Sequence, residues 1–257
     1  MKIYLNNAAT SYPKPPCVIS AMAECLKQPP GDAHRGGLSK RDRFEETREK
    51  LALLLGGAEP KQIALAANAT QGLNMALFGF PFRQGDVVLT TMAEHNAVLR
   101  PLYQLEKQRI VKNIFLKTDE AGRVDPRQWE RAVEIYRPRL CVFTHASNVT
   151  GAVNDAKDMA FAAKKRGASV LLDASQTLGL TQLNAKEWGL DMVAFTGHKY
   201  LLGPQGTGGL YVSPEIRLTP HFVGGTGVRS DELEMPENMP LHLEAGTPNE
   251  AAAAGLC

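Results

Sequence analysis

Short runs of apolar and β-branched residues recur along this chain, and most are separated by segments whose apolar residues have helical spacing. The runs predict strands over Ile63 to Ala66, Val87 to Thr90, Ile110 to Leu116, Leu140 to Thr144, Val170 to Leu172, Met192 to Phe195 and Gly209 to Val212. Alternation of this kind predicts an α/β fold whose sheet is mainly parallel, doubly wound and flanked by helices. Ligands of such sheets bind beyond the carboxyl ends of the strands.

The ends of several segments carry helix signals. Pro15 and Pro16 open one helix, and a second helix ends at Gly56-Gly57. Asp125-Pro126 pairs a capping residue with a helix opener. The polar, Pro-containing stretch from Arg229 to Pro240 predicts a surface loop.

The composition narrows the classes of partner. The 257 residues are 44% hydrophobic, which suffices for a large core, and 29 basic and 27 acidic residues are mixed along the chain. This leaves no basic stripe for nucleic acid, and no apolar run is long enough to cross a membrane. Four cysteines are scattered without metal-ligand or disulfide-framework spacing. We therefore expect a cytoplasmic protein with reduced thiols and a small-molecule partner.

An acid and a lysine follow two of the predicted strands. Asp173 ends the apolar run from Val170, with Gln176 three residues later, and Lys199 follows the run from Met192. Each residue alone is more often a turn residue or a surface charge. Together at one rim they suit pyridoxal 5′-phosphate (PLP), because lysine forms an imine with its aldehyde and a carboxylate keeps its pyridine nitrogen protonated.

Three more polar residues follow predicted strands. Thr70 lies at the start of a helix, where free N–H groups bind phosphate, although an ordinary Asn68 or Thr70 helix cap is the simpler interpretation. His95 could stack on a cofactor ring or only cap a turn. Asn148 could donate to the cofactor or form the turn before Gly151.

A series of motifs in this order resembles class V aminotransferase-fold enzymes, and within them the cysteine desulfurase and selenocysteine lyase group. It comprises Leu5-Asn6-Asn7-Ala8-Ala9-Thr10, Ala33-His34-Arg35-Gly36, Ala69-Thr70-Gln71, Glu94-His95-Asn96, Ser147-Asn148-Val149-Thr150-Gly151, Asp173-Ala174-Ser175-Gln176, Thr196-Gly197-His198-Lys199 and Glu244-Ala245-Gly246-Thr247-Pro248-Asn249. The resemblance spans nearly the whole chain. It implies the PLP-dependent transferase fold type I, represented here by its large domain.

The resemblance also implies residue roles. The catalytic residues would be Lys199, His95 and Asp173, with Lys199 bound to PLP, Asp173 at its ring nitrogen and His95 stacked on its ring. The implied cofactor-binding residues are Ala69, Thr70, His95, Asn148, Asp173, Gln176, Thr196, His198, Lys199 and Thr247. Thr247 matches a threonine that reaches the phosphate of a second subunit, so a homodimer with shared active sites is implied.

The expected organisation is an N-terminal segment near the active site, residues 1–20, and a PLP-binding large domain, residues 21–257. Family members continue into a small C-terminal domain with a carboxylate-binding arginine and, in desulfurases, a sulfur-accepting cysteine. We expect that this domain is missing and that the chain is truncated, since no cysteine here matches that position.

The leading hypothesis is a PLP-dependent cysteine desulfurase that converts L-cysteine to L-alanine and passes sulfur to an acceptor thiol, with a sulfur-acceptor protein as partner. An aminotransferase, a selenocysteine lyase, an epimerase of the same fold, or a non-catalytic PLP-binding fragment are the alternatives. The glycine-rich stretch Gly203 to Gly209 precedes a predicted strand instead of a helix, which argues against a dinucleotide loop. No metal site is expected, because the histidines lack ligand spacing.

Overall fold

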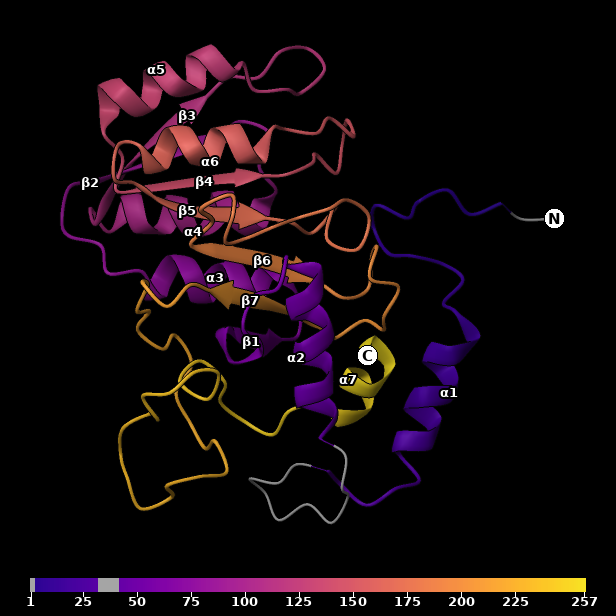
Figure 1. Cartoon of the computed structure of the whole chain (residues 1–257). Helices are drawn as coiled ribbons and strands as arrows, with labels where there is room; N and C mark the ends of the chain where they lie inside the picture. Colours follow the sequence, from indigo (N-terminus) through magenta and orange to yellow (C-terminus); the bar gives the residue numbers. More distant parts are fainter. Residues whose placement is uncertain (1–2, 32–41) are drawn as a thin grey trace.

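A computed structural model describes residues 3–31 and 42–257, so Met1, Lys2 and the motif Ala33 to Gly36 lie outside the described residues. A central sheet has the strand order β1-β7-β6-β5-β4-β2-β3 (Figure 1). Its strands are β1 (Ile63–Ala66), β2 (Asp86–Thr91), β3 (Val111–Leu116), β4 (Leu140–Thr144), β5 (Ser169–Asp173), β6 (Met192–Thr196) and β7 (Gly208–Val212). All seven predicted strands are therefore present.

Helices connect most of these strands. They are α1 (Pro16–Cys25), α2 (Arg43–Leu54), α3 (Ala69–Gly79), α4 (Asn96–Lys107), α5 (Pro126–Tyr136), α6 (Ala156–Lys164) and α7 (Glu250–Leu256), with a short 3-10 helix, η2, over Pro60–Gln62. At α2, α3, α5, α6 and α7, a side-chain oxygen of the N-cap residue, such as that of Asp125 at α5, accepts a hydrogen bond from the first turn of the helix. At α4 the acceptor is a ring nitrogen of the N-cap residue. Helix α1 begins instead with Pro16, as predicted, and packs against α7 (Figure 1).

Successive strands are added toward one edge of the sheet as far as β3, and from β4 onward they are added toward the other edge. Strand β2 pairs in parallel with β3 on one side and with β4 on the other, and β4, β5 and β6 continue in parallel. The topological switch point is thus at the boundary between β2 and β4, and ligands of doubly wound sheets bind at the carboxyl ends of the strands beside such a point. Strand β7 runs antiparallel between β6 and β1, an exception to the parallel sheet that the alternation does not reveal.

The core has two layers, one on each face of the sheet. Val170 and Leu172 of β5 pack with α2, α5 and α6, whereas Leu171 between them packs with α3 and α4. This follows from the strand period of two, which requires apolar residues at every position of a strand covered on both faces. Trp129 of α5 is fully buried and donates from Nε1 to the Met159 carbonyl of α6 at 2.9 Å.

The segment from Gly224 to Asn249 contains no helix or strand, in agreement with the loop predicted from Arg229 to Pro240. A partly buried ion pair fixes its C-terminal end. Arg48 of α2 donates from Nη2 to both carboxylate oxygens of Glu244 at 2.9 and 2.8 Å, and the Leu65 N–H donates to Glu244 Oε1 at 2.6 Å. The loop is therefore tied to α2 and β1 at one point. Within residues 3–31 and 42–257, no helix is long and apolar enough to span a membrane.

We predict that Glu244→Ala lowers the free energy of unfolding by about 3 kcal/mol, because Arg48 would remain largely buried with only the exposed carboxylate of Glu45, 3.7 Å away, as a counter-charge. The side chains of Arg48 and Glu244 are only 8% and 15% exposed. Chemical denaturation measures the change. Glu237→Ala is the matched control, since its pair with Arg217 is 79% and 75% exposed and should contribute less than about 1 kcal/mol. Equal losses in the two variants would contradict this assignment.

Candidate active site

The carboxyl ends of the parallel strands meet at one rim of the sheet. In register, Thr144 of β4 pairs with Asp173 of β5, and Asp173 pairs with Ala194 of β6. Lys199 lies in the turn that follows β6. Because β1 is antiparallel to β7 and β7 is antiparallel to β6, β1 also ends at this rim, and α3 starts there. The topology thus brings these predicted site residues to one edge of the sheet.

Asp173 is the last residue of β5 and is 4% exposed. Its Oδ1 accepts hydrogen bonds from the Ser175 N–H at 2.9 Å and from the Ser175 hydroxyl. Within the described part of the chain, Oδ2 accepts no hydrogen bond. One oxygen is therefore fixed by the turn, and the other is available to a ligand at the rim.

Lys199 is half-buried, and the Asp173 carboxylate is near enough to act on its charge. Burial lowers the pKa of the Lys199 ammonium, and the negative charge of Asp173 raises it to a smaller extent. The net effect makes the neutral, nucleophilic amine more accessible than in a solvated lysine. Among the described residues, no side chain or carbonyl accepts a hydrogen bond from Nζ, which leaves the amine available for chemistry.

The start of α3 offers a site for an anion. Its cap, Asn68, accepts a hydrogen bond from the Gln71 N–H at 2.9 Å. The N–H groups of Ala69 and Thr70 have no partner among the described residues, and they lie at the positive end of the helix dipole. Gly208 of β7 allows the start of α3 to lie close to this strand, because a Cβ at position 208 would lie 2.7 Å from the Asn68 Cα.

Of three further predicted residues, two make contacts within the chain and the third is exposed. His95 is exposed and caps α4, with Nδ1 accepting from the Ala97 N–H at 3.1 Å. Asn148 is exposed in the turn from 148 to 150. Thr196 is buried, and its hydroxyl donates to the Thr207 carbonyl at 3.4 Å. The capping interpretation of His95 is thus realised, and cofactor contacts by the three remain predictions.

The N-terminal segment crosses the rim and contacts two predicted site residues. Gln176 donates from Nε2 to the Ala8 carbonyl at 3.0 Å. The His198 carbonyl, directly before Lys199, accepts from Thr10 Oγ1 at 3.1 Å, from Ser11 N at 3.0 Å and Oγ at 3.1 Å, and from Lys14 Nζ at 2.8 Å. The segment therefore fixes the turn that carries Lys199, while the proposed division at residue 20 stays a prediction.

Sequence reasoning missed two residues of this site. Lys14 is separated by 184 positions from the carbonyl that it binds, so no local pattern indicates the contact. Glu94 belongs to the motif around His95 and is buried at the rim. A glutamate between an apolar strand and a helix cap is the signal that could have drawn attention to it.

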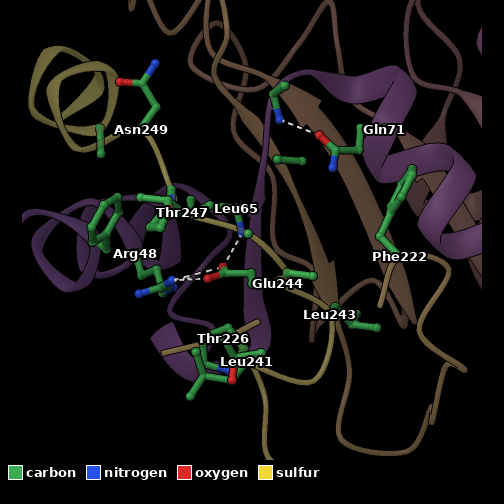
Figure 2. Close-up of a pocket in the computed structure, with 18 of the residues that line it drawn as sticks. Arg48, Leu65, Gln71, Phe222, Thr226, Leu241, Leu243, Glu244, Thr247 and Asn249 are labelled. Atoms are coloured by element: carbon green, nitrogen blue, oxygen red, sulfur yellow. Dashed lines mark hydrogen bonds and ion pairs between the residues drawn. The ribbon is translucent and has the colours of Figure 1, made fainter. Parts of the chain in front are cut away.

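A cavity of about 920 Å³ lies beside the rim, where Ala67 and Gln71 line it at the end of β1 and the start of α3. Figure 2 shows Arg48, Glu244, Thr247 and Phe222 around it, beside β1 and the loop after β7. Of the predicted site residues, Thr247 lines this cavity and Lys199 does not. Within one chain, Thr247 is thus placed at this cavity and the other predicted residues gather at the rim.

A sequence model of the family described as Aminotransferase class-V matches residues 3–257. A probable cysteine desulfurase of Methanothermobacter thermautotrophicus is 36% identical, over 99% of this chain and 64% of that protein. A probable cysteine desulfurase of Pyrococcus abyssi is 34% identical, over 99% of this chain and 65% of that protein. The chain therefore spans about two thirds of the length of these curated relatives, and the predicted family resemblance is confirmed.

Solved structures agree with the fold. The apo cysteine desulfurase of Thermococcus onnurineus superposes with a TM-score of 0.86 at 30% identity, covering 99% of this chain and 65% of that one. The cysteine desulfurase CsdA of Escherichia coli also gives a TM-score of 0.86, at 29% identity, covering 98% and 65%. The α/β fold with a mainly parallel sheet is thus confirmed.

We predict that Lys14→Met loosens the turn that carries Lys199. A hydrogen bond from a charged donor contributes about 1.5 kcal/mol, so amide exchange at Leu202 and Gly203, whose N–H groups close this turn, should become about tenfold faster. Hydrogen–deuterium exchange with peptide mapping measures this change. Lys27→Met, which removes an exposed ammonium paired with Glu24, is the control and should leave exchange unchanged. Unchanged exchange in both variants would show that the Lys14 contact does not restrain the turn.

Proposed function

Because the chain belongs to the class V aminotransferase family, we propose that its rim binds PLP and that it acts on an amino acid as a cysteine desulfurase. The observation that carries the proposal is the pair formed by Lys199 and Asp173. A half-buried amine with a lowered pKa and a buried carboxylate with one available oxygen lie at the ends of neighbouring parallel strands. PLP requires these two groups, at its aldehyde carbon and at its ring nitrogen.

The remaining contacts of the cofactor would come from the same rim. The N–H groups of Ala69 and Thr70 fit the phosphate, as does the Thr70 hydroxyl. Burial and the charges of Lys199 and Lys14 lower the pKa of His198, whose Nδ1 faces Thr10 Oγ1 at 3.0 Å. Its Nε2 would donate to the phosphate once the Thr10 hydroxyl turns from the His198 carbonyl to donate to Nδ1. Thr196 would join them after its hydroxyl leaves the Thr207 carbonyl, a contact of only 3.4 Å.

Contacts to the ring would come from three elements. His95 would stack on the ring from the start of α4, and Asn148 and Gln176 would reach its phenolic oxygen or the substrate carboxylate. Gln176 at present donates to the Ala8 carbonyl, so it can orient the N-terminal segment and the cofactor together. Bound PLP supplies an electron sink that makes the substrate α-carbon acidic.

The residues of the chain would then carry out the proton transfers. Lys199 would hold the cofactor covalently and, once the substrate amine displaces it, move the proton at the substrate α-carbon with its neutral amine. Asp173 would hold the proton at the ring nitrogen through Oδ2. The turn fixed by Lys14 and Ser11 would keep Nζ in position, which preserves the orientation on which such transfers depend.

The proposed substrate is L-cysteine, and the support is the naming of the relatives as cysteine desulfurases. The reaction breaks the carbon–sulfur bond, releases L-alanine and transfers the sulfur to an acceptor thiol as a persulfide. We propose a protein as the final sulfur acceptor. We also propose a homodimer with shared sites, because Thr247 faces its own cavity beside Arg48 and could serve the phosphate of a second subunit. A cytoplasmic location is proposed from the scattered spacing of the four cysteines.

We predict that Lys199→Ala abolishes the absorbance band of PLP bound as a Schiff base. PLP is titrated into the wild-type chain and the variant, and the spectra are recorded after removal of free cofactor. Lys186→Ala, which removes an exposed lysine, is the control and should keep the band. A band of wild-type size in Lys199→Ala would contradict the assignment of Lys199.

We predict that Asp173→Asn retains PLP but forms alanine from L-cysteine at least about 100-fold more slowly, because a neutral amide cannot hold the ring nitrogen protonated. Alanine, sulfide and 2-oxo acid are quantified together. Asp191→Asn, a buried aspartate at the opposite end of β6, is the control and should keep turnover per bound PLP. A 2-oxo acid as the main product would indicate an aminotransferase, and PLP binding with no product would indicate a non-catalytic PLP-binding chain.

A further inference from the structure

Glu94 is a buried glutamate to which the proposed reaction assigns no role. It lies between β2 and α4 and is 6% exposed. Its Oε1 accepts from the Thr91 hydroxyl at 2.5 Å and from the Thr144 N–H at 3.0 Å. Its Oε2 is buried and has no hydrogen-bond partner among the described residues.

These contacts place Glu94 at the switch point of the sheet. Strands β2 and β4 pair directly at Val88–Leu140 and at Leu89–Cys141. Leu140 and Cys141 are the first two residues of β4. Nearer the rim, Glu94 takes over the connection, because it joins the last residue of β2, Thr91, to the last residue of β4, Thr144. The carboxyl group therefore bridges the two strands between which the site opens.

The surroundings of Glu94 disfavour its ionised form. Burial is the main cause that raises the pKa of Glu94 to about 8, the bonds from Thr91 and Thr144 oppose it, and the charge of Asp173 raises it further. The neighbouring imidazoles do not compensate. His145, next after Thr144, has a pKa lowered by burial, with a smaller opposite effect from Asp155, and His95 is exposed and uses Nδ1 as a cap. An ionised Glu94 would leave Oε2 as a buried charge without a donor.

We propose that Glu94 is a positioning residue that carries a proton, bridges β2 and β4 as a neutral acid, and leaves Asp173 as the one negative charge facing the cofactor ring. This inference rests on the proposed function, since it depends on the role given to Asp173. Both carboxyl groups are largely buried, and in each one oxygen accepts two hydrogen bonds, so the difference lies in the second oxygen. Oε2 of Glu94 is enclosed without a partner, so this group keeps the proton, whereas Oδ2 of Asp173 is not enclosed in this way and is available to the cofactor ring, so this group keeps the charge.

The protonation state can be measured in the chain without cofactor. We expect the infrared spectrum at pH 7 to contain the carbonyl band of a buried, protonated carboxylic acid, and Glu94→Gln to lack that band. Glu106→Gln is the matched control, because Glu106 accepts the Asn113 N–H at 2.9 Å away from the rim. The control should keep the band. A wild-type spectrum without it at pH 7 would overturn the proposal.

The pH dependence of stability provides a second test. Because the pKa of Glu94 is higher in the folded than in the unfolded chain, the wild-type chain loses stability relative to Glu94→Gln as pH rises from the ordinary glutamate range, about 4.5, through about 8. The Tm of Glu94→Gln minus that of wild type should therefore increase between pH 5 and pH 9, and Glu106→Gln should show no such trend. A constant difference would contradict a neutral Glu94.

A third measurement links the proton to the cofactor. With PLP bound, the wild-type absorbance should change in a step near pH 8 as Glu94 ionises beside Asp173, and Glu94→Gln should lack that step. A step that persists in Glu94→Gln would overturn the link between Glu94 and the ring. If PLP does not bind at Lys199, the proposed function fails, whereas the infrared result on the cofactor-free chain still decides the protonation of Glu94.

Discussion

The candidate site depends on the parallel pairing of β2, β4, β5 and β6. Parallel strands end on the same side, so four strand ends that lie between Thr91 and Thr196 in the sequence meet at one rim. The last residue of each of these strands is polar, namely Thr91, Thr144, Asp173 and Thr196, and the apolar layers on both faces hold the sheet rigid beneath. The precision of the site is thus supplied by buried apolar strand residues that carry no chemistry themselves.

Charge at this rim is controlled by burial. The same loss of solvent lowers the pKa of Lys199 and raises that of Glu94, since it disfavours the ionised form of either group. The consequence is an amine more ready to act as a nucleophile beside a carboxylate, Asp173, that has one oxygen anchored by Ser175. The N-terminal segment then completes the rim, because it covers the peptide before Lys199 with four donors.

The sequence predicted the parts of this account that depend on local pattern. Strands covered on both faces are continuously apolar, so β1 and β4 were placed residue for residue, and the residues after the strands followed from topology. The antiparallel insertion of β7 and the contact of Lys14 with the His198 carbonyl were not predictable, because they depend on pairing between distant segments. The burial of Glu94 was likewise not visible in its motif.

The central claim is that the rim of strand ends holds PLP through one lysine. The most direct measurement is reduction of the PLP-loaded wild-type chain with borohydride, followed by proteolysis and mass spectrometry of the pyridoxyl-labelled peptide. The account predicts one labelled peptide, with the label on Lys199. Label on Lys14 or another lysine, or label spread over several surface lysines, would contradict it.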